Sequence, residues 1–248
     1  MASAPYFPLE ARGLGVTLGG HAALDAVDLV LDGRARAVVL GPNGSGKSVL
    51  LRVLHGLIAP TAGAVLWAGS PARAPDQAMV FQRPVMLRRS ALANVEYALA
   101  LNGVAVSERE TRAWEAIDRV GLAYLAKRPA RVLLGGEQQR LALARAWALR
   151  PRVIFLDEPT ASLDPAAASE VERVIGEIHA AGTAIVMTTH HLGLARRVAD
   201  EILFLHEGRL TEHTAVEDFF TAPRSAEAAR FLKGELPWNK TSSGPSTE

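Results

Sequence analysis

Residues 41–48 read Gly-Pro-Asn-Gly-Ser-Gly-Lys-Ser and fit the pattern G-x-x-x-x-G-K-[S/T] of a phosphate-binding loop. Glycines let successive backbone N–H groups curl around phosphate oxygens, and a helix that starts near Lys47 adds its positive N-terminal end. Lys47 can then reach the terminal phosphates of a nucleotide, and Ser48 can ligate Mg²⁺. The alternative is a glycine-rich turn, which the apolar run before the loop and the helical spacing after it disfavour. The predicted nucleotide-binding residues are Gly41, Pro42, Asn43, Gly44, Ser45, Gly46, Lys47, Ser48 and Val49.

A second candidate is the acid pair that ends the apolar run "VIFLDEP" at residues 153–159. Two acids after four apolar residues are costly to bury unless they face a cation or polarise water. Beside a phosphate-binding loop, Asp157 would hold Mg²⁺ and Glu158 would orient or deprotonate an attacking water. The alternative is an acid pair at a strand end that merely faces solvent.

The third candidate is "LLGGEQQR" at residues 133–140, where two glycines open an apolar helical run. Each glycine costs a helix roughly 1 kcal/mol, so the pair needs a reason. One reading is a plain loop. The other is a backbone that approaches an anion closely and offers it bare N–H groups at a helix start.

Composition narrows the class of protein. The chain has 248 residues, 49% hydrophobic and 21% charged, with a net charge of +1 and no cysteine. These values predict a globular protein that is not a strongly basic nucleic-acid binder, and they exclude disulfides, thiolate zinc sites and Cys-ligated iron–sulfur clusters. No uncharged apolar run reaches the ~18 residues of a membrane span, and residues 1–13 lack the apolar core of a signal peptide. We therefore expect a soluble, intracellular protein.

Strands must alternate with helices to position these motifs. Buried strands are predicted at residues 35–40, 153–156 and 183–189, with a last strand and turn over 201–210. A helix follows the loop over 48–58. Another helix follows the acid pair, with Asp164 as N-cap, Pro165 as first residue and Gly182 as stop. This alternation predicts a mainly parallel sheet covered on both faces.

Two regions depart from the alternation. Residues ~84–130 show helical patterns without a clear strand, which predicts a helical insertion, and residues 8–31 predict an antiparallel β-layer. The expected organisation is one domain, 1–236, with an α/β core (about 1–82 and 150–210), a helical subdomain (about 83–149) and a C-terminal helix (about 211–236). Residues 237–248 are expected to be a polar, disordered tail.

These motifs resemble, in type and order, those of the ATP-binding subunits of ABC transporters, over nearly the whole chain. Residues 41–48 look like Walker A, 153–158 like Walker B, and 133–140 like the signature motif. Gln82 looks like the Q-loop glutamine, "SLD" at 162–164 like the D-loop and His190 like the switch histidine. The resemblance implies an α/β P-loop NTPase (RecA-like) core with an antiparallel β-layer and an inserted helical subdomain, acting with ATP and Mg²⁺.

The resemblance also implies roles. Glu158, His190 and Lys47 would be catalytic, while Ser48, Gln82 and Asp157 would contact Mg²⁺. Gln82 would also sense the γ-phosphate and couple the site to the helical insertion. Taken alone, a glutamine after an apolar run and a histidine at a strand end are more often ordinary surface or core residues.

The resemblance implies three partners. Two copies would pair head-to-tail, so that the ATP held by one copy faces five residues of the other copy: Leu134, Gly135, Gly136, Glu137 and Asp164. A separate permease would dock near Gln82–Tyr97 on a cleft where Met86 and Leu87 offer apolar contact, keeping the chain peripheral on the cytoplasmic side of the membrane. A solute-binding protein would act indirectly. The alternative interpretation of Arg83, Arg88 and Arg89 is that they form an ordinary solvated surface with no docking role.

The pattern around Gln82 and the ending at 219–238 are similar to importer subunits, notably of tungstate, and also of phosphate and amino acids. Other hypotheses are a translation or repair ATPase, which usually carries two such units or a coiled-coil insertion, and a nucleotide-binding regulator with little turnover.

Four positions depart from the family pattern. Leu134 replaces the signature serine, and a lost hydrogen bond to a charged group costs roughly 1.5–3 kcal/mol. Leu18 stands where an aromatic usually stacks on adenine. Val49 replaces a second hydroxyl residue. His191 replaces an acid, and a His190–His191 metal pair is disfavoured because neighbouring side chains on a strand point to opposite faces.

Overall fold

The computed structural model describes residues 6–70 and 76–235, built around a six-stranded sheet of order β5-β6-β7-β3-β8-β9. Neighbouring strands are parallel, except that β9 runs antiparallel to β8. The strands are β3 (Ala37–Leu40), β5 (Gln77–Val80), β6 (Val153–Asp157), β7 (Ala184–Thr189), β8 (Glu201–His206) and β9 (Arg209–Ala215). Every residue of β3, β6 and β7 is buried, so the prediction of a covered, mainly parallel sheet is confirmed.

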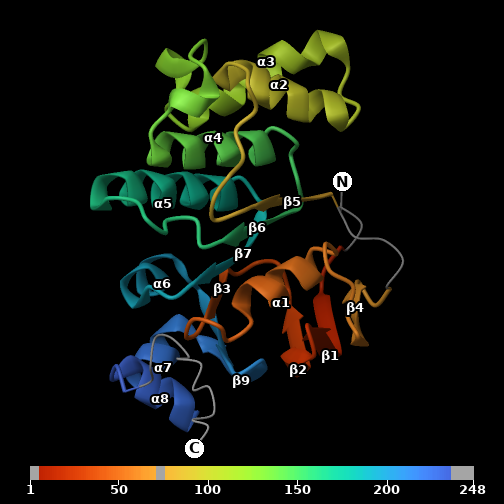
Figure 1. The fold of residues 1–248 in the computed structure, drawn as a ribbon, viewed down its shortest axis with the longest axis vertical. Helices are drawn as coiled ribbons and strands as arrows, with labels where there is room; N and C mark the ends of the chain where they lie inside the picture. Colours follow the sequence, from red (N-terminus) through yellow and green to blue (C-terminus); the bar gives the residue numbers. More distant parts are fainter. Residues whose placement is uncertain (1–5, 71–75, 236–248) are drawn as a thin grey trace, which may run out of the picture.

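A smaller antiparallel sheet of order β2-β1-β4 covers one side of the molecule, as predicted for residues 8–31 (Figure 1). Its strands are β1 (Leu9–Leu18), β2 (His21–Leu31) and β4 (Ala62–Trp67). It packs with helix α1 (Lys47–Leu54) onto one face of the central sheet, through residues such as Val39 and Phe155. The phosphate-binding loop therefore lies where the small sheet meets the central one.

The opposite face of the central sheet packs on helices through alternate residues such as Leu40 and Leu156. Helices α4 (Gly135–Trp147), α5 (Pro165–Ala180) and α6 (Leu192–Val198) cover this face. Helices α2 (Ala91–Leu101) and α3 (Val106–Arg119) extend the same core by packing on α4 and on each other, and 3₁₀ turns follow at Ala123–Leu125 and Ala130–Val132. Figure 1 shows α2 and α3 at one end of the molecule, with α4 between them and α5. Helices α2 and α3 fall in the stretch predicted to be helical. Within the described ranges, no helix is both long enough and apolar enough to cross a bilayer.

The expected C-terminal helix over about 211–236 is wrong in its first part. Residues Arg209–Ala215 form β9, because they complete a hairpin with β8. Two short helices follow, α7 (Val216–Thr221) and α8 (Ala226–Leu232). The buried carboxylate of Glu212 accepts hydrogen bonds from the backbone N–H groups of Arg224 and Ser225, which fixes the break between them. The predicted tail, 237–248, lies outside the described residues.

Candidate nucleotide-binding site

The phosphate-binding loop connects β3 to α1, and close backbone approaches require glycine at two of its positions, Gly41 and Gly46. A Cβ atom on Gly41 would lie 2.1 Å from the carbonyl oxygen of Leu205, and one on Gly46 would lie 2.5 Å from that of Ala23. Gly46 also has a φ of +103°, a conformation that other residues rarely adopt. The N–H of Gly208 donates to the Ser45 carbonyl at 3.0 Å. The loop is thus wedged between β2 and the β8–β9 hairpin, and its shape is preformed.

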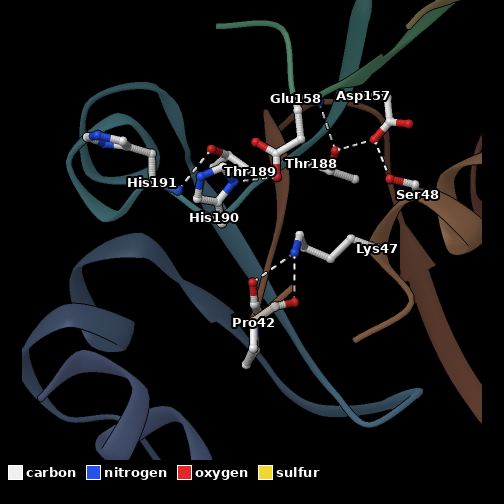
Figure 2. Close-up of polar contacts among 10 residues, drawn as sticks. Pro42, Lys47, Ser48, Asp157, Glu158, Thr188, Thr189, His190 and His191 are labelled. Atoms are coloured by element: carbon white, nitrogen blue, oxygen red, sulfur yellow. Dashed lines mark hydrogen bonds and ion pairs between the residues drawn. The ribbon is translucent and has the colours of Figure 1, made fainter. Parts of the chain in front are cut away.

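Lys47 is buried with its ammonium group held over this loop. Its Nζ donates to the carbonyl oxygens of Gly41 and Pro42, each at 2.9 Å (Figure 2). Burial lowers the pKa of Lys47, while the charges of Glu158 and Asp157 oppose that shift. The Oγ of Ser45 is buried and has no hydrogen-bond partner within the described part of the chain. An ammonium group and a spare hydroxyl in a preformed loop suit phosphate oxygens.

Asp157 ends β6 and meets the helix that follows the loop. Its Oδ1 accepts from Ser48 Oγ at 2.7 Å and from Thr188 Oγ1 at 2.9 Å (Figure 2). The Oγ of Ser48 keeps lone pairs while it donates, so serine and aspartate offer the hard oxygen ligands that Mg²⁺ prefers. Over residues 6–70 and 76–235, no group of three or more acidic or histidine side chains is arranged to hold a metal alone. The residues fit Mg²⁺ as part of a site that phosphate oxygens would complete.

Glu158 follows directly in a left-handed backbone conformation, with φ of +48°. Its N–H donates to Thr188, to the carbonyl at 3.2 Å and the hydroxyl at 3.0 Å, so β7 supports this strained residue. Its Oε1 lies 2.8 Å from His190 Nδ1, and this hydrogen bond raises the pKa of His190. Figure 2 shows the His191 ring directed away from His190, as expected. The structure therefore brings a strand-end carboxylate and a histidine into direct contact.

Gln82 is exposed just beyond β5 and lines a cavity of about 580 Å³ together with Glu158, His190 and Ser162. Leu18 is the last residue of β1 and is 46% exposed, so its side chain is open to a ligand. Val49 lies in the first turn of α1 and packs, partly buried, against the core beneath that helix.

The two glycines at the start of α4 have different surroundings. Gly136 is buried, and a Cβ atom there would lie 2.6 Å from the Cβ of Ala167 on α5. Gly135 is exposed, and its Cβ would meet only Leu163 Cδ2 at 3.6 Å, an ordinary contact. Helix packing therefore explains Gly136, while Gly135 has no such packing reason.

Leu134 occupies the N-cap of α4 and is 73% exposed. Its N–H donates to Glu137 Oε2 at 2.8 Å, which is one half of a capping box. A leucine side chain has no acceptor to return, so the second half is not made. Because α4 packs on the face of the central sheet opposite to α1, this segment belongs to a different side of the molecule from the phosphate-binding loop.

Asp164 is the N-cap of α5, as predicted, and its Oδ1 accepts from the N–H of Ala167 at 2.9 Å. Sequence reasoning missed Thr188 and Arg52, which both contact Asp157. In the sequence, Thr188 could have been identified as a hydroxyl residue two positions before His190, and Arg52 as a cationic residue four positions after Ser48.

A second cavity, of about 540 Å³, lies between β5, α2 and α4, along the segment predicted to bind a permease. The expectation that Met86 offers apolar contact there is wrong, because Met86 is buried in the core. Val85, at 73% exposed, and Phe81 line the cavity instead. The guanidinium of Arg89 lies 4.7 Å from the ring centre of Tyr97, and Arg145 donates to the Val85 carbonyl at 2.8 Å. The cavity is lined mainly by apolar side chains together with Arg145, and Arg89 lies beside it over Tyr97.

Comparison with known proteins matches these features to one family. The family model described as "ABC transporter" matches residues 24–161, and one described as "AAA domain, putative AbiEii toxin, Type IV TA system" matches 127–196. The tungstate uptake system ATP-binding protein TupC of Peptoclostridium acidaminophilum is 38% identical over 78% of this chain and 92% of its own. The methionine import ATP-binding protein MetN of Caulobacter vibrioides is 37% identical over 87% and 68%. Other relatives are named for import of Fe³⁺ ions and phosphate and for transport of glutamate.

Solved structures of ABC ATP-binding cassettes have the same fold as this chain. The cbiO1 protein of Clostridium perfringens, part of the ABC transporter complex cbiONQ, superposes with a TM-score of 0.80 at 26% identity, covering 93% of this chain and 96% of that one. The ATP-binding cassette MJ0796, a dimer in a post-hydrolysis state with ADP and Pi, superposes with a TM-score of 0.74 at 27% identity, over 84% and 98%. With the Walker-type geometry above, these matches show that the chain belongs to the ABC transporter family, as an importer-type ATP-binding subunit whose ATPase activity powers transport.

Proposed function

We propose that ATP is bound and hydrolysed by the residues gathered around Asp157 and that this drives import of a small oxyanion, such as tungstate, through a separate permease. The observation that carries the proposal is the contact of Ser48 with Asp157 next to the pair Glu158–His190. These contacts bring together the phosphate loop, a carboxylate that could hold a metal ion (Asp157) and a carboxylate that could accept a proton from water (Glu158).

Each side chain has a distinct task. The loop N–H groups, Ser45 Oγ and Lys47 bind phosphate oxygens. Mg²⁺ held through Ser48 and Asp157, with Gln82 near it, would neutralise charge on the transferred phosphate. Glu158 accepts the proton of the attacking water at Oε1, once its contact with His190 loosens. His190 then turns its Nδ1–H to the γ-phosphate.

The functional unit is a head-to-tail dimer of two copies. Support comes from the exposed Leu134 and Gly135 at the start of α4, which point a helix N-terminus at solvent, and from the dimeric state of the similar cassette MJ0796. Residues 134–137 and Asp164 of one copy would complete the site of the other.

The permease would dock in the cavity between β5, α2 and α4, on the cytoplasmic face of the membrane. An apolar lining that includes Phe81 and Val85, with Arg145 in its wall and Arg89 beside Tyr97, suits an amphipathic helix that carries acidic residues. Variants Val85→Asp and Phe81→Asp should abolish co-purification with the permease while leaving ATP binding intact.

The most specific element of the proposal is the identity of the imported solute. The 38% identity to the tungstate subunit supports an oxyanion, and relatives named for phosphate, methionine or glutamate define the alternatives. The test is co-expression with a permease and a solute-binding protein that co-purify with this chain, followed by measurement of the uptake of tungstate, phosphate and amino acids. Glu158-dependent uptake of methionine or glutamate, without uptake of any oxyanion, would replace the oxyanion reading.

A second candidate is a nucleotide-dependent regulator with low turnover, which the missing hydroxyl at Leu134 favours. Steady-state hydrolysis in the complex with the permease separates the two. Turnover that needs Glu158 and rises with solute supports transport, whereas binding of ATP without turnover supports the regulator.

A further inference from the structure

The two oxygens of the Asp157 carboxylate have different partners. Oδ1 accepts hydrogen bonds from Ser48 and Thr188, while Oδ2 lies 3.5 Å from Nη2 of Arg52. The Asp157 side chain is only 4% exposed. A buried carboxylate is costly without a nearby cation. The charge of Lys47 already acts on Asp157, and Arg52 places a second cation on the oxygen that the hydroxyls do not use.

Helix geometry explains why one element supplies both kinds of partner. Ser48 and Arg52 are four residues apart on α1, so they lie on the same face of the helix. That face delivers a hydroxyl to one carboxylate oxygen and a guanidinium group to the other.

Arg52 is nevertheless loosely held. Its side chain is 42% exposed, and its Nε is buried without a hydrogen-bond partner in the described part of the chain. The 3.5 Å separation is longer than the 2.7–2.9 Å of a strong charge-assisted hydrogen bond. Arg52 therefore acts on Asp157 mainly through its charge and not through a strong hydrogen bond.

We propose that Arg52 is a positioning residue that neutralises Asp157 while the nucleotide is absent, so that metal binding at this site depends on the nucleotide. The inference rests on the proposed function only in taking Ser48 and Asp157 as the metal-binding residues. A divalent cation approaching Asp157 alone meets the repulsion of Arg52. ATP brings phosphate charges that offset this repulsion, so metal and nucleotide enter together.

The experiment uses the full chain without nucleotide and Mn²⁺ as the probe, with free Mn²⁺ counted by electron paramagnetic resonance. Coulomb repulsion between a guanidinium group and a divalent cation at one carboxylate lowers affinity by about tenfold or more. Arg52→Gln should therefore bind one Mn²⁺ about tenfold more tightly than the wild-type chain. Arg52→Lys, which keeps the charge, should behave as wild type. Adding Asp157→Asn to Arg52→Gln should remove the gained site.

Arg230→Gln on α8 is the matched control, because it changes the net charge equally at an exposed position outside the site. Unchanged or weaker Mn²⁺ binding in Arg52→Gln overturns the proposal, and so does a gain that survives Asp157→Asn. Arg52→Met gives a second neutral variant if Arg52→Gln fails to fold. A wild-type complex that hydrolyses no ATP would contradict the proposed function and leave this comparison of Mn²⁺ affinities intact.

Discussion

Two parts of the proposed site differ in how many of their polar groups find partners within the single chain. The nucleotide half comprises the phosphate loop with Asp157, Glu158 and His190, and the signature half is the start of α4. Around the phosphate loop, Lys47 is held by backbone carbonyls, Ser48 donates to Asp157, and Glu158 contacts His190. At the start of α4, by contrast, an exposed leucine and an exposed glycine face solvent. One chain therefore preforms the first half, whereas in the proposed head-to-tail dimer the second half would meet its ligand only in the other copy. The predictions below test that division of labour.

The largest effect is expected in the nucleotide half, from Glu158→Gln. A glutamine keeps the size of the side chain but cannot take a proton from water, so turnover should fall about 100-fold or more. ATP affinity should change little, because the loop and Lys47 are untouched. Steady-state hydrolysis in the permease complex and nucleotide titration measure the two quantities. Glu172→Gln, an acid in the same cavity, is the control. A tenfold loss or less would mean that Glu158 is not the base.

The signature half is tested by Leu134→Ser. A serine hydroxyl would return a hydrogen bond to the charged γ-phosphate, worth roughly 1.5–3 kcal/mol, or about 10- to 150-fold in the step that needs it. It would also complete the capping box with Glu137 and stabilise the chain by about 1 kcal/mol. Turnover and ATP-dependent dimerisation should both rise, while Leu134→Ala should raise neither. A higher melting temperature with unchanged turnover would restrict the hydroxyl to capping.

The glycine pair sharpens the comparison further. Gly136→Ala places a methyl group 2.6 Å from Ala167 Cβ and should cost about 1–3 kcal/mol of unfolding free energy. That corresponds to a melting temperature lower by roughly 2–12 °C. Gly135→Ala makes an ordinary contact at 3.6 Å and should leave stability unchanged or slightly higher. Thermal unfolding compares the two variants directly, and equal losses would contradict the assignment of Gly136 to packing.

The nucleotide half was predictable from sequence because its chemistry is local. A phosphate loop needs glycines at fixed spacing, and a strand-end acid pair needs a cation, so Lys47, Ser48, Asp157 and Glu158 were found. Thr188 and Arg52 were missed because their partner, Asp157, is more than 30 residues away in the sequence. The role of Gly136 was missed for a similar reason, since the close approach of α5 is a tertiary contact.

The same limit explains the errors in the fold. Residues 211–215 were predicted to be helical but belong to strand β9, because pairing with β8 decides their conformation and local propensity does not. Met86 was predicted to offer a surface contact but is buried, because the short apolar run at residues 85–87 does not reveal which of its side chains faces the core.

The smallest effect concerns the pair Glu158–His190 in the absence of nucleotide. The hydrogen bond to Glu158 raises the pKa of His190 above 6.5. The pair therefore contributes stability that is fully present below pH 6.5 and is lost as pH rises through the raised value. Since His190 is more than one-third exposed, solvent screening leaves about 0.5 kcal/mol, or roughly 1–2 °C.

The measurement is the melting temperature of wild type minus that of His190→Gln, followed against pH. The difference should be largest at acidic pH and vanish at alkaline pH, and Glu158→Gln should flatten it. Leu134→Ser, by contrast, should shift the melting temperature by the same amount from neutral to alkaline pH, because the added hydroxyl does not titrate and Glu137 stays ionised over that range. If the melting-temperature difference for His190→Gln instead grew with pH, the Glu158–His190 pair would not contribute stability as predicted. The predicted difference in pH dependence between the two halves of the site would then be contradicted.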